Sequence, residues 1–189
     1  MPLAHHVILS LYGFWLPNDP RGSWSDFVGS WDLLRYGKAT KVETRRSVAH
    51  VRHDARARLQ AKRALRHPPV RLSGRQARAV GRGFARAVAE SRYVVHACSV
   101  LPDHVHLVVG RHERTVGRIV GHLKARATQR LGAEGLWPPD KRPVWGGRGW
   151  KVFLDTPGDV RRAVAYVEDN PVKDGKPRQR WSFVVTFEG

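Results

Sequence analysis

The sequence predicts an α+β protein built as a split βαβ sandwich, with an antiparallel sheet and helices packed on one face. Two observations support this prediction. Short β-branched runs and helical patterns follow one another in the order β, α, β, β, α, β. The second and third strands are separated by a short turn containing proline, as in a hairpin. An arginine-rich helical insert at about residues 35–72 lengthens the first connection, and all 189 residues are expected to form one domain.

Four strands are expected. Residues 5–12, HHVILSLY, are β-branched and apolar and predict the first strand. Residues 93–100, YVVHACSV, and residues 104–109 predict a hairpin. Residues 149–154, GWKVFL, predict the fourth strand, and the tail QRWSFVVTF either adds a strand or packs on the core.

Four helices are expected as well. Residues 44–66 have a thin apolar stripe among many arginines. A second helix begins at the capping-box pattern of Ser73 and Gln76. A third helix runs from a cap at Thr115 to Leu131. Residues 156–171 predict the last helix, which its proline is expected to end.

The charge of the chain points to a polyanionic partner. Lys and Arg total 34 against 16 Asp and Glu, a formal charge of +18. A membrane surface would attract the same charge, but the sequence has no apolar run near the length of a membrane span. Nucleic acid is therefore the expected partner, and no association with a membrane is expected.

The expected location is the cytoplasm, in association with the nucleoid. The sequence has one cysteine, Cys98, and its amino terminus has no signal-peptide pattern.

Basic and aromatic residues suggest where nucleic acid binds. Between residues 35 and 92 lie 17 of the 34 basic residues and three acids, although such a face can also be merely solvated. The loop GFWLPNDPRGSWSD carries tryptophans that are expected to stack on bases, or alternatively to cover the core. The candidate nucleic-acid contacts are Trp15, Arg21, Trp24, Arg45, Arg46, Arg52, Arg56, Arg63 and Arg162.

The segment LPDHVHLVVG, residues 101–110, suggests a metal site. In a strand, His104 and His106 project to one face while Val105 projects to the other. Two imidazoles so placed can converge on one ion, but a third ligand must come from elsewhere. A structural role, with each ring donating to a carbonyl, stays open.

The last helix offers candidate partners for this pair. Tyr166 and Asn170 are four residues apart and share a helix face with Arg162. If the helix lies over the histidines, the Asn170 amide oxygen can supply the third ligand and the Tyr166 hydroxyl can act as a nucleophile. A tyrosine hydroxyl is mostly neutral at pH 7, so a cation that polarises a phosphate would help. Alternatively, Tyr166 is a half-buried helix residue and Asn170 a turn residue before proline.

These motifs resemble a known family. LPDHVHLVV resembles the His-hydrophobic-His motif of the HUH endonuclease superfamily. YVEDNPVKDG resembles the Tyr-x-x-x-Asn-Pro-Val segment of its single-tyrosine transposases, in particular the REP-associated tyrosine transposases. YGFWLPNDPRGSW is similar to the tryptophan- and proline-rich segment of such proteins. Together the similar segments span most of the chain.

The resemblance implies a ferredoxin-like sandwich that cuts single-stranded DNA near hairpins, using Mg²⁺ or Mn²⁺, in transposition or DNA recombination. His104 and His106 would be catalytic metal ligands, with Asn170 as the third ligand. Tyr166 would form a 5′-phosphotyrosine link and free a 3′-OH. Insertion-sequence relatives have glutamine in place of Asn170, and the shortest relatives lack the insert at about 35–72. Whether a monomer or a homodimer builds the site is left open.

Two other classes of function fit the same residues. A nucleic-acid-binding module on the same sandwich would carry structural histidines and perform no chemistry. An RNA-processing phosphoesterase would cleave RNA without needing Tyr166.

Overall fold

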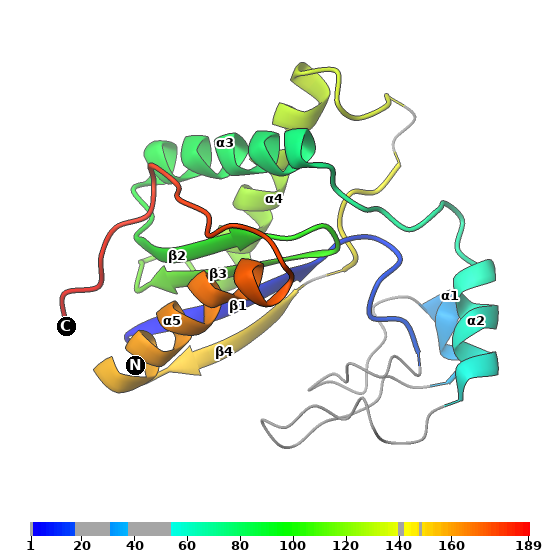
Figure 1. The fold of residues 1–189 in the computed structure, drawn as a ribbon, viewed down its shortest axis with the longest axis horizontal. Helices are drawn as coiled ribbons and strands as arrows, with labels where there is room; N and C mark the ends of the chain where they lie inside the picture. Colours follow the sequence, from blue (N-terminus) through cyan, green and yellow to red (C-terminus); the bar gives the residue numbers. More distant parts are fainter. Residues whose placement is uncertain (1, 18–30, 38–53, 140–141, 148) are drawn as a thin grey trace.

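The computed structural model describes residues 2–17, 31–37, 54–139, 142–147 and 149–189. A four-stranded sheet lies at its centre, in the order β2-β3-β1-β4, and every neighbouring pair is antiparallel. The strands are β1 (Ala4–Ser10), β2 (Val95–Val100), β3 (His104–Gly110) and β4 (Trp150–Leu154). The predicted α+β class and split βαβ order are therefore confirmed, and the histidine pair lies on a central strand (Figure 1).

Two helices cover one face of the sheet. α3 (Gly74–Ser91) connects β1 to β2, and α4 (Val116–Ala133) connects β3 to β4. The helices approach closely at Gly83, where an added Cβ would lie 2.5 Å from the Ala127 Cα. Side chains from both layers form the main core, which includes Val7, Leu9, Leu11, Phe84, Val105, Leu107, Val109 and Leu123.

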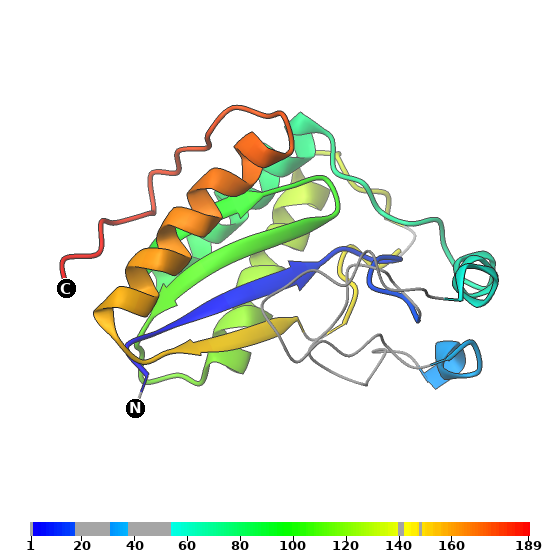
Figure 2. The same ribbon diagram turned by 60° about the horizontal axis from the view of Figure 1, so that its bottom comes forward.

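The last helix lies on the opposite face. α5 (Pro157–Lys173) packs its apolar stripe on this second face of the sheet, where Val108 of β3 is buried. Figure 2 shows α5 along one side of the strands and α4 on the other. The expectation of helices on one face is right for α3 and α4 and wrong for α5. The second face also presents apolar side chains, and a further amphipathic helix is needed to bury them.

Pro171 does not end α5 as predicted, because the helix continues to Lys173. A proline has no N–H, so the backbone bond to the carbonyl of Val167 is lost. The loss falls in the last turn, and the Asp174 N–H then donates to the carbonyls of Asn170 and Pro171 at 3.3 and 3.1 Å. The helix end is thereby closed although it contains a proline.

The carboxyl-terminal segment, residues 176–189, follows the outer edge of β2. The Gln179 side chain donates to the Val100 carbonyl at 2.9 Å and accepts from the Val100 N–H at 2.7 Å. Farther along, the Val185 N–H donates to the Val95 carbonyl at 2.9 Å. The segment thus packs against the sheet and satisfies polar groups that an edge strand would otherwise expose.

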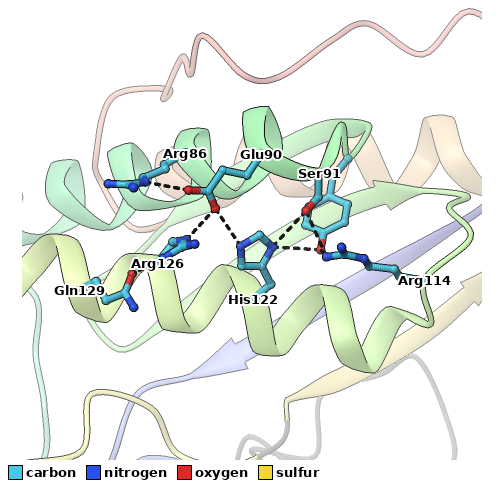
Figure 3. A network of polar contacts seen from close by, with 8 residues as sticks. Arg86, Glu90, Ser91, Arg114, His122, Arg126 and Gln129 are labelled. Carbon is cyan, nitrogen blue, oxygen red and sulfur yellow. Dashed lines mark hydrogen bonds and ion pairs between the residues drawn. The ribbon is translucent and has the colours of Figure 1, made fainter.

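A polar network joins α3 to α4 (Figure 3). The Glu90 carboxylate accepts from Arg86 Nε at 2.9 Å, from Arg126 Nε at 2.7 Å and from His122 Nε2 at 3.1 Å. The Arg86 and Arg126 hydrogen bonds are the main reason that the pKa of Glu90 is lowered to about 2. On its other side, His122 Nδ1 lies 3.0 Å from the Tyr93 hydroxyl. The network fixes the two crossover helices against one another.

The insert lies beside the sheet. Its described helix is α2 (Ala55–Arg63), and α1 (Trp31–Leu34) lies next to it (Figure 1). Leu16, Leu33 and Ala61 form a small apolar cluster there. Of the helix predicted at 44–66, the structure shows α2, which begins after the N-cap Asp54 and ends at Arg63, three residues early; residues 44–53 lie outside the described residues. Within the described ranges, no helix combines the length and apolar character that crossing a membrane requires.

Candidate active site

The histidine pair and the last helix meet on the second face of the sheet. His104 and His106 face α5, while Val105 between them is buried in the main core. The two imidazole rings have centroids 4.7 Å apart. The ring of Tyr166, on α5, approaches the ring of His106 edge-on, with centroids 5.5 Å apart. The structure therefore brings His104, His106 and Tyr166 together, three of the four side chains that the sequence predicts for this site.

Each histidine of the pair is held through its Nδ1 atom. His104 Nδ1 lies 2.7 Å from Asp103 Oδ1. His106 Nδ1 lies 2.9 Å from His6 Nε2. Within the part of the chain that the structure describes, no hydrogen bond reaches Nε2 of either ring. Both Nε2 atoms are thus available to coordinate a bound group.

His6 is a residue of the site that the sequence analysis missed. The strand register pairs Ile8 of β1 with His106, so His6 lies diagonally across from His106 on the same face. Its ring stacks on His106 at 5.1 Å and meets the edge of Tyr166 at 5.7 Å. Because His6 alternates with the buried Val7, the sequence could have predicted which face of the sheet His6 occupies. It could not predict that His6 lies beside His106, because that depends on how β1 pairs with β3.

Burial keeps the central imidazoles neutral. It lowers the pKa of His6 to about 4. Burial is also the main reason that the pKa of His106 lies well below its ordinary value, and the nearby His104 and His6 lower it further. A neutral imidazole keeps one lone pair, which a metal ligand requires.

Unpaired polar atoms lie on α5 and on the strand next to the histidines. Asn170 is one helical turn beyond Tyr166, and its Nδ2 is buried without a hydrogen-bond partner among the described residues. The same holds for the hydroxyl of Ser99, which is paired in register with His106. Buried polar groups without partners are costly. Two buried polar atoms on the α5 side of the sheet therefore have no partner among the described residues.

The donors present fit a divalent cation. Imidazole nitrogens are ligands of first-row divalent metals, and a carboxamide oxygen and water are ligands that Mg²⁺ and Mn²⁺ prefer. Among the described residues, no group of three or more His, Cys, Asp or Glu side chains could hold a metal ion. A carboxamide such as that of Asn170, together with oxygens from water or substrate, would have to complete the coordination.

Trp15 and Lys173 border the site. Trp15 has a φ of 54°, in the left-handed region that large side chains seldom adopt. Its ring lies edge-on to His104 at 5.4 Å. Lys173 Nζ lies 4.9 Å from the centroid of the Tyr166 ring. Since Tyr166 is 45 % exposed, a substrate can reach its ring beside an aromatic group and a cation.

The other predicted nucleic-acid contacts are dispersed. Arg56 and Arg63 are exposed on α2, in the insert beside the sheet. Arg162 is exposed on α5, and its Nη2 donates to Asp159 Oδ1 at 2.6 Å. The predicted contacts that lie outside the described residues are Arg21, Trp24, Arg45, Arg46 and Arg52.

Comparison with known proteins identifies a similar fold. No model of a protein family and no curated protein sequence matches this chain. A solved structure of a REP-associated tyrosine transposase bound to a REP hairpin is similar, with a TM-score of 0.51 and 16 % identity. The similarity covers 97 % of this chain and 76 % of that chain. At this level of identity the similarity shows that the two proteins share a fold.

Proposed function

We propose that this protein is a metal-dependent endonuclease and strand transferase that acts on single-stranded DNA next to hairpins. The observation that carries the proposal is the position of Tyr166, whose exposed ring meets the buried His106. A nucleophile beside two imidazoles with free Nε2 atoms is the arrangement that phosphoryl transfer to tyrosine needs. The fold that the chain shares with a hairpin-bound tyrosine transposase supports the same class of substrate.

The chain's own residues account for binding and positioning. His104, His106 and Asn170 would hold a bound Mg²⁺ or Mn²⁺, which supplies Lewis-acid stabilisation of the charge that develops on the phosphate. Lys173, 4.9 Å from the Tyr166 ring, places a further positive charge beside the nucleophile. One chain supplies all these residues, so the proposal needs no partner subunit.

The proposed reaction exchanges one phosphate ester for another. The Tyr166 hydroxyl oxygen attacks the phosphorus and loses its proton to solvent. The bond from phosphorus to the 3′-oxygen breaks, and that oxygen takes up a proton and leaves as a 3′-OH. The downstream strand stays attached to Tyr166 through its 5′-phosphate. Because the link is again a phosphodiester, a second 3′-OH can reverse the exchange and join a new strand.

The charge of the protein supports a nucleic-acid substrate. The formal charge is +18, and a DNA strand would gain binding energy from the release of its counterions. Exposed arginines on α2 extend the basic surface beyond the site. We infer that the protein acts on DNA in the cytoplasm, as a nucleoid-associated enzyme of transposition or recombination.

A covalent adduct is the decisive test. The full chain is incubated with Mn²⁺ and with single-stranded hairpin oligonucleotides labelled at either end, and the products are separated under denaturing conditions. The 3′-labelled strand is expected to become attached to protein, and the 5′-labelled strand to be released with an extendable 3′-OH. Tyr166→Phe should form no adduct. Tyr12→Phe, which also removes a hydroxyl and keeps a ring, should form it normally.

The other outcomes identify the alternative functions. Tight DNA binding with no adduct on any hairpin would show a nucleic-acid-binding module. Cleavage of RNA that persists in Tyr166→Phe would show a phosphoesterase that needs no tyrosine. Either result would overturn the proposal.

A further inference from the structure

Two imidazoles that share a hydrogen bond must divide the roles of donor and acceptor. His6 Nε2 and His106 Nδ1 lie 2.9 Å apart, and one of them carries the proton. If His106 is to offer the lone pair of Nε2 to a cation, its own proton must be on Nδ1. His106 Nδ1–H then donates to His6 Nε2, and His6 must carry its proton on Nδ1.

We propose that His6 is a positioning residue that fixes the tautomer and the ring orientation of His106 through this hydrogen bond. The inference rests on the proposed function and extends it to a residue of the first strand. Ring stacking at 5.1 Å adds a second restraint on the plane of His106. Partners that hold the second nitrogen of a metal-bound histidine usually change metal affinity by roughly 10- to 100-fold.

Asp103 holds the Nδ1 atom of His104, as His6 holds that of His106. Its Oδ1 lies 2.7 Å from His104 Nδ1, so the carboxylate selects the tautomer with a free Nε2. The two partners differ in chemistry, since Asp103 is an acid at the turn and His6 is a partly buried imidazole on β1. The histidine pair is thus oriented from two separate elements, which makes each contribution separately testable.

His5 provides a matched control. It is the neighbour of His6 in β1, but it projects to the opposite face, where its ring meets Phe153 at 5.4 Å. Replacing His5 changes the same strand and the same residue type without touching His106. His6→Gln is the conservative variant, because its amide oxygen can accept from His106 Nδ1–H.

The first measurement needs no variant. Nitrogen-15 NMR of the histidine side chains in the metal-free protein should show His106 and His6 both protonated at Nδ1. In His6→Leu, His106 should move toward the Nε2-protonated tautomer.

The second measurement is Mn²⁺ affinity, by calorimetry without DNA. In His6→Leu this affinity should fall by roughly 10- to 100-fold. His6→Gln should stay within a few-fold of the unmodified protein, and His5→Leu should match it.

Several results would overturn the positioning role. One is an unmodified protein in which His106 carries its proton on Nε2. Another is Mn²⁺ binding by His6→Leu that is as tight as in the unmodified protein, which would leave the proposed function intact. Complete loss of Mn²⁺ binding in both His6 variants, with the fold retained, would instead make His6 a ligand. If the unmodified protein forms no adduct and binds no Mn²⁺, the proposed function itself fails.

Discussion

The ring of Tyr166 stands edge-on to the ring of His106, with centroids 5.5 Å apart and the ring planes at 81°. Neither β3, which carries His106, nor α5, which carries Tyr166, could produce this contact alone. α5 is held on the second face by Val160 and Val167, which are fully buried there. That packing sets the rotation of the helix about its axis, so Tyr166 projects past the apolar contact toward the histidines. The candidate nucleophile is thus positioned by apolar packing.

Removing a central histidine should separate cleavage from binding. His106→Ala is expected to reduce adduct formation by at least about 100-fold, because it deletes a proposed ligand next to the nucleophile. Affinity for single-stranded DNA should change less than about two-fold, since phosphate neutralisation uses other residues. A gel shift run beside a nicking assay measures both, with His5→Ala as the control. Equal loss of binding and cutting would contradict the separation.

Arginines on α2 should show the reverse pattern. Replacing Arg56 and Arg63 together by glutamine is expected to lower the magnitude of the slope of log K against log salt by about 1.4, if each contacts one phosphate of a single strand. Adduct formation at saturating DNA should be unchanged. Arg82 and Arg130, which pair with Glu134 between α3 and α4, provide a charge-matched control. An unchanged slope would place the DNA path away from α2.

The close approach of α3 and α4 predicts a stability effect. In Gly83→Ala, the new Cβ would lie 2.5 Å from the Ala127 Cα, and the backbone cannot yield as a side chain could. We expect a loss of about 1–3 kcal/mol in the free energy of unfolding, measured by urea denaturation. Gly121→Ala in α4 meets nothing within 4 Å and should instead gain roughly 0.5–1 kcal/mol. A stable Gly83→Ala protein would disprove the close helix contact.

The ion-pair network at Glu90 predicts a dependence of stability on pH. Its carboxyl has a pKa of about 2 in the folded protein, against an ordinary value of 4.5. A lowered pKa means that the folded state binds the proton less readily, so this stabilisation is complete above pH 4.5 and is lost as the pH falls toward 2. Glu90→Gln should therefore have a lower melting temperature than the unmodified protein near pH 7. The difference between the two melting temperatures should shrink as the pH falls from 4.5 to 2. A difference in melting temperature that stays constant across that pH range would refute the assignment.

Local signals in the sequence located most elements correctly. The Ser73 and Gln76 pattern predicted the start of α3, where both side-chain-to-backbone bonds of the capping box are present. The spacing of His104 and His106 placed both on one face, because alternation is a property of every strand. Pro171 misled the prediction of the end of α5, since the same residue can end a helix or occupy its last turn.

The sequence by itself determined which residues share a strand or helix face, since those periods follow from backbone geometry within one element. Only the tertiary structure decided that α5 lies opposite α3 and α4 and that His6 lies diagonally beside His106. Both depend on contacts between segments distant in the chain, namely the register of β1 on β3 and the burial of the second sheet face. The free energy of that burial comes from the assembled layers, so no single segment encodes it.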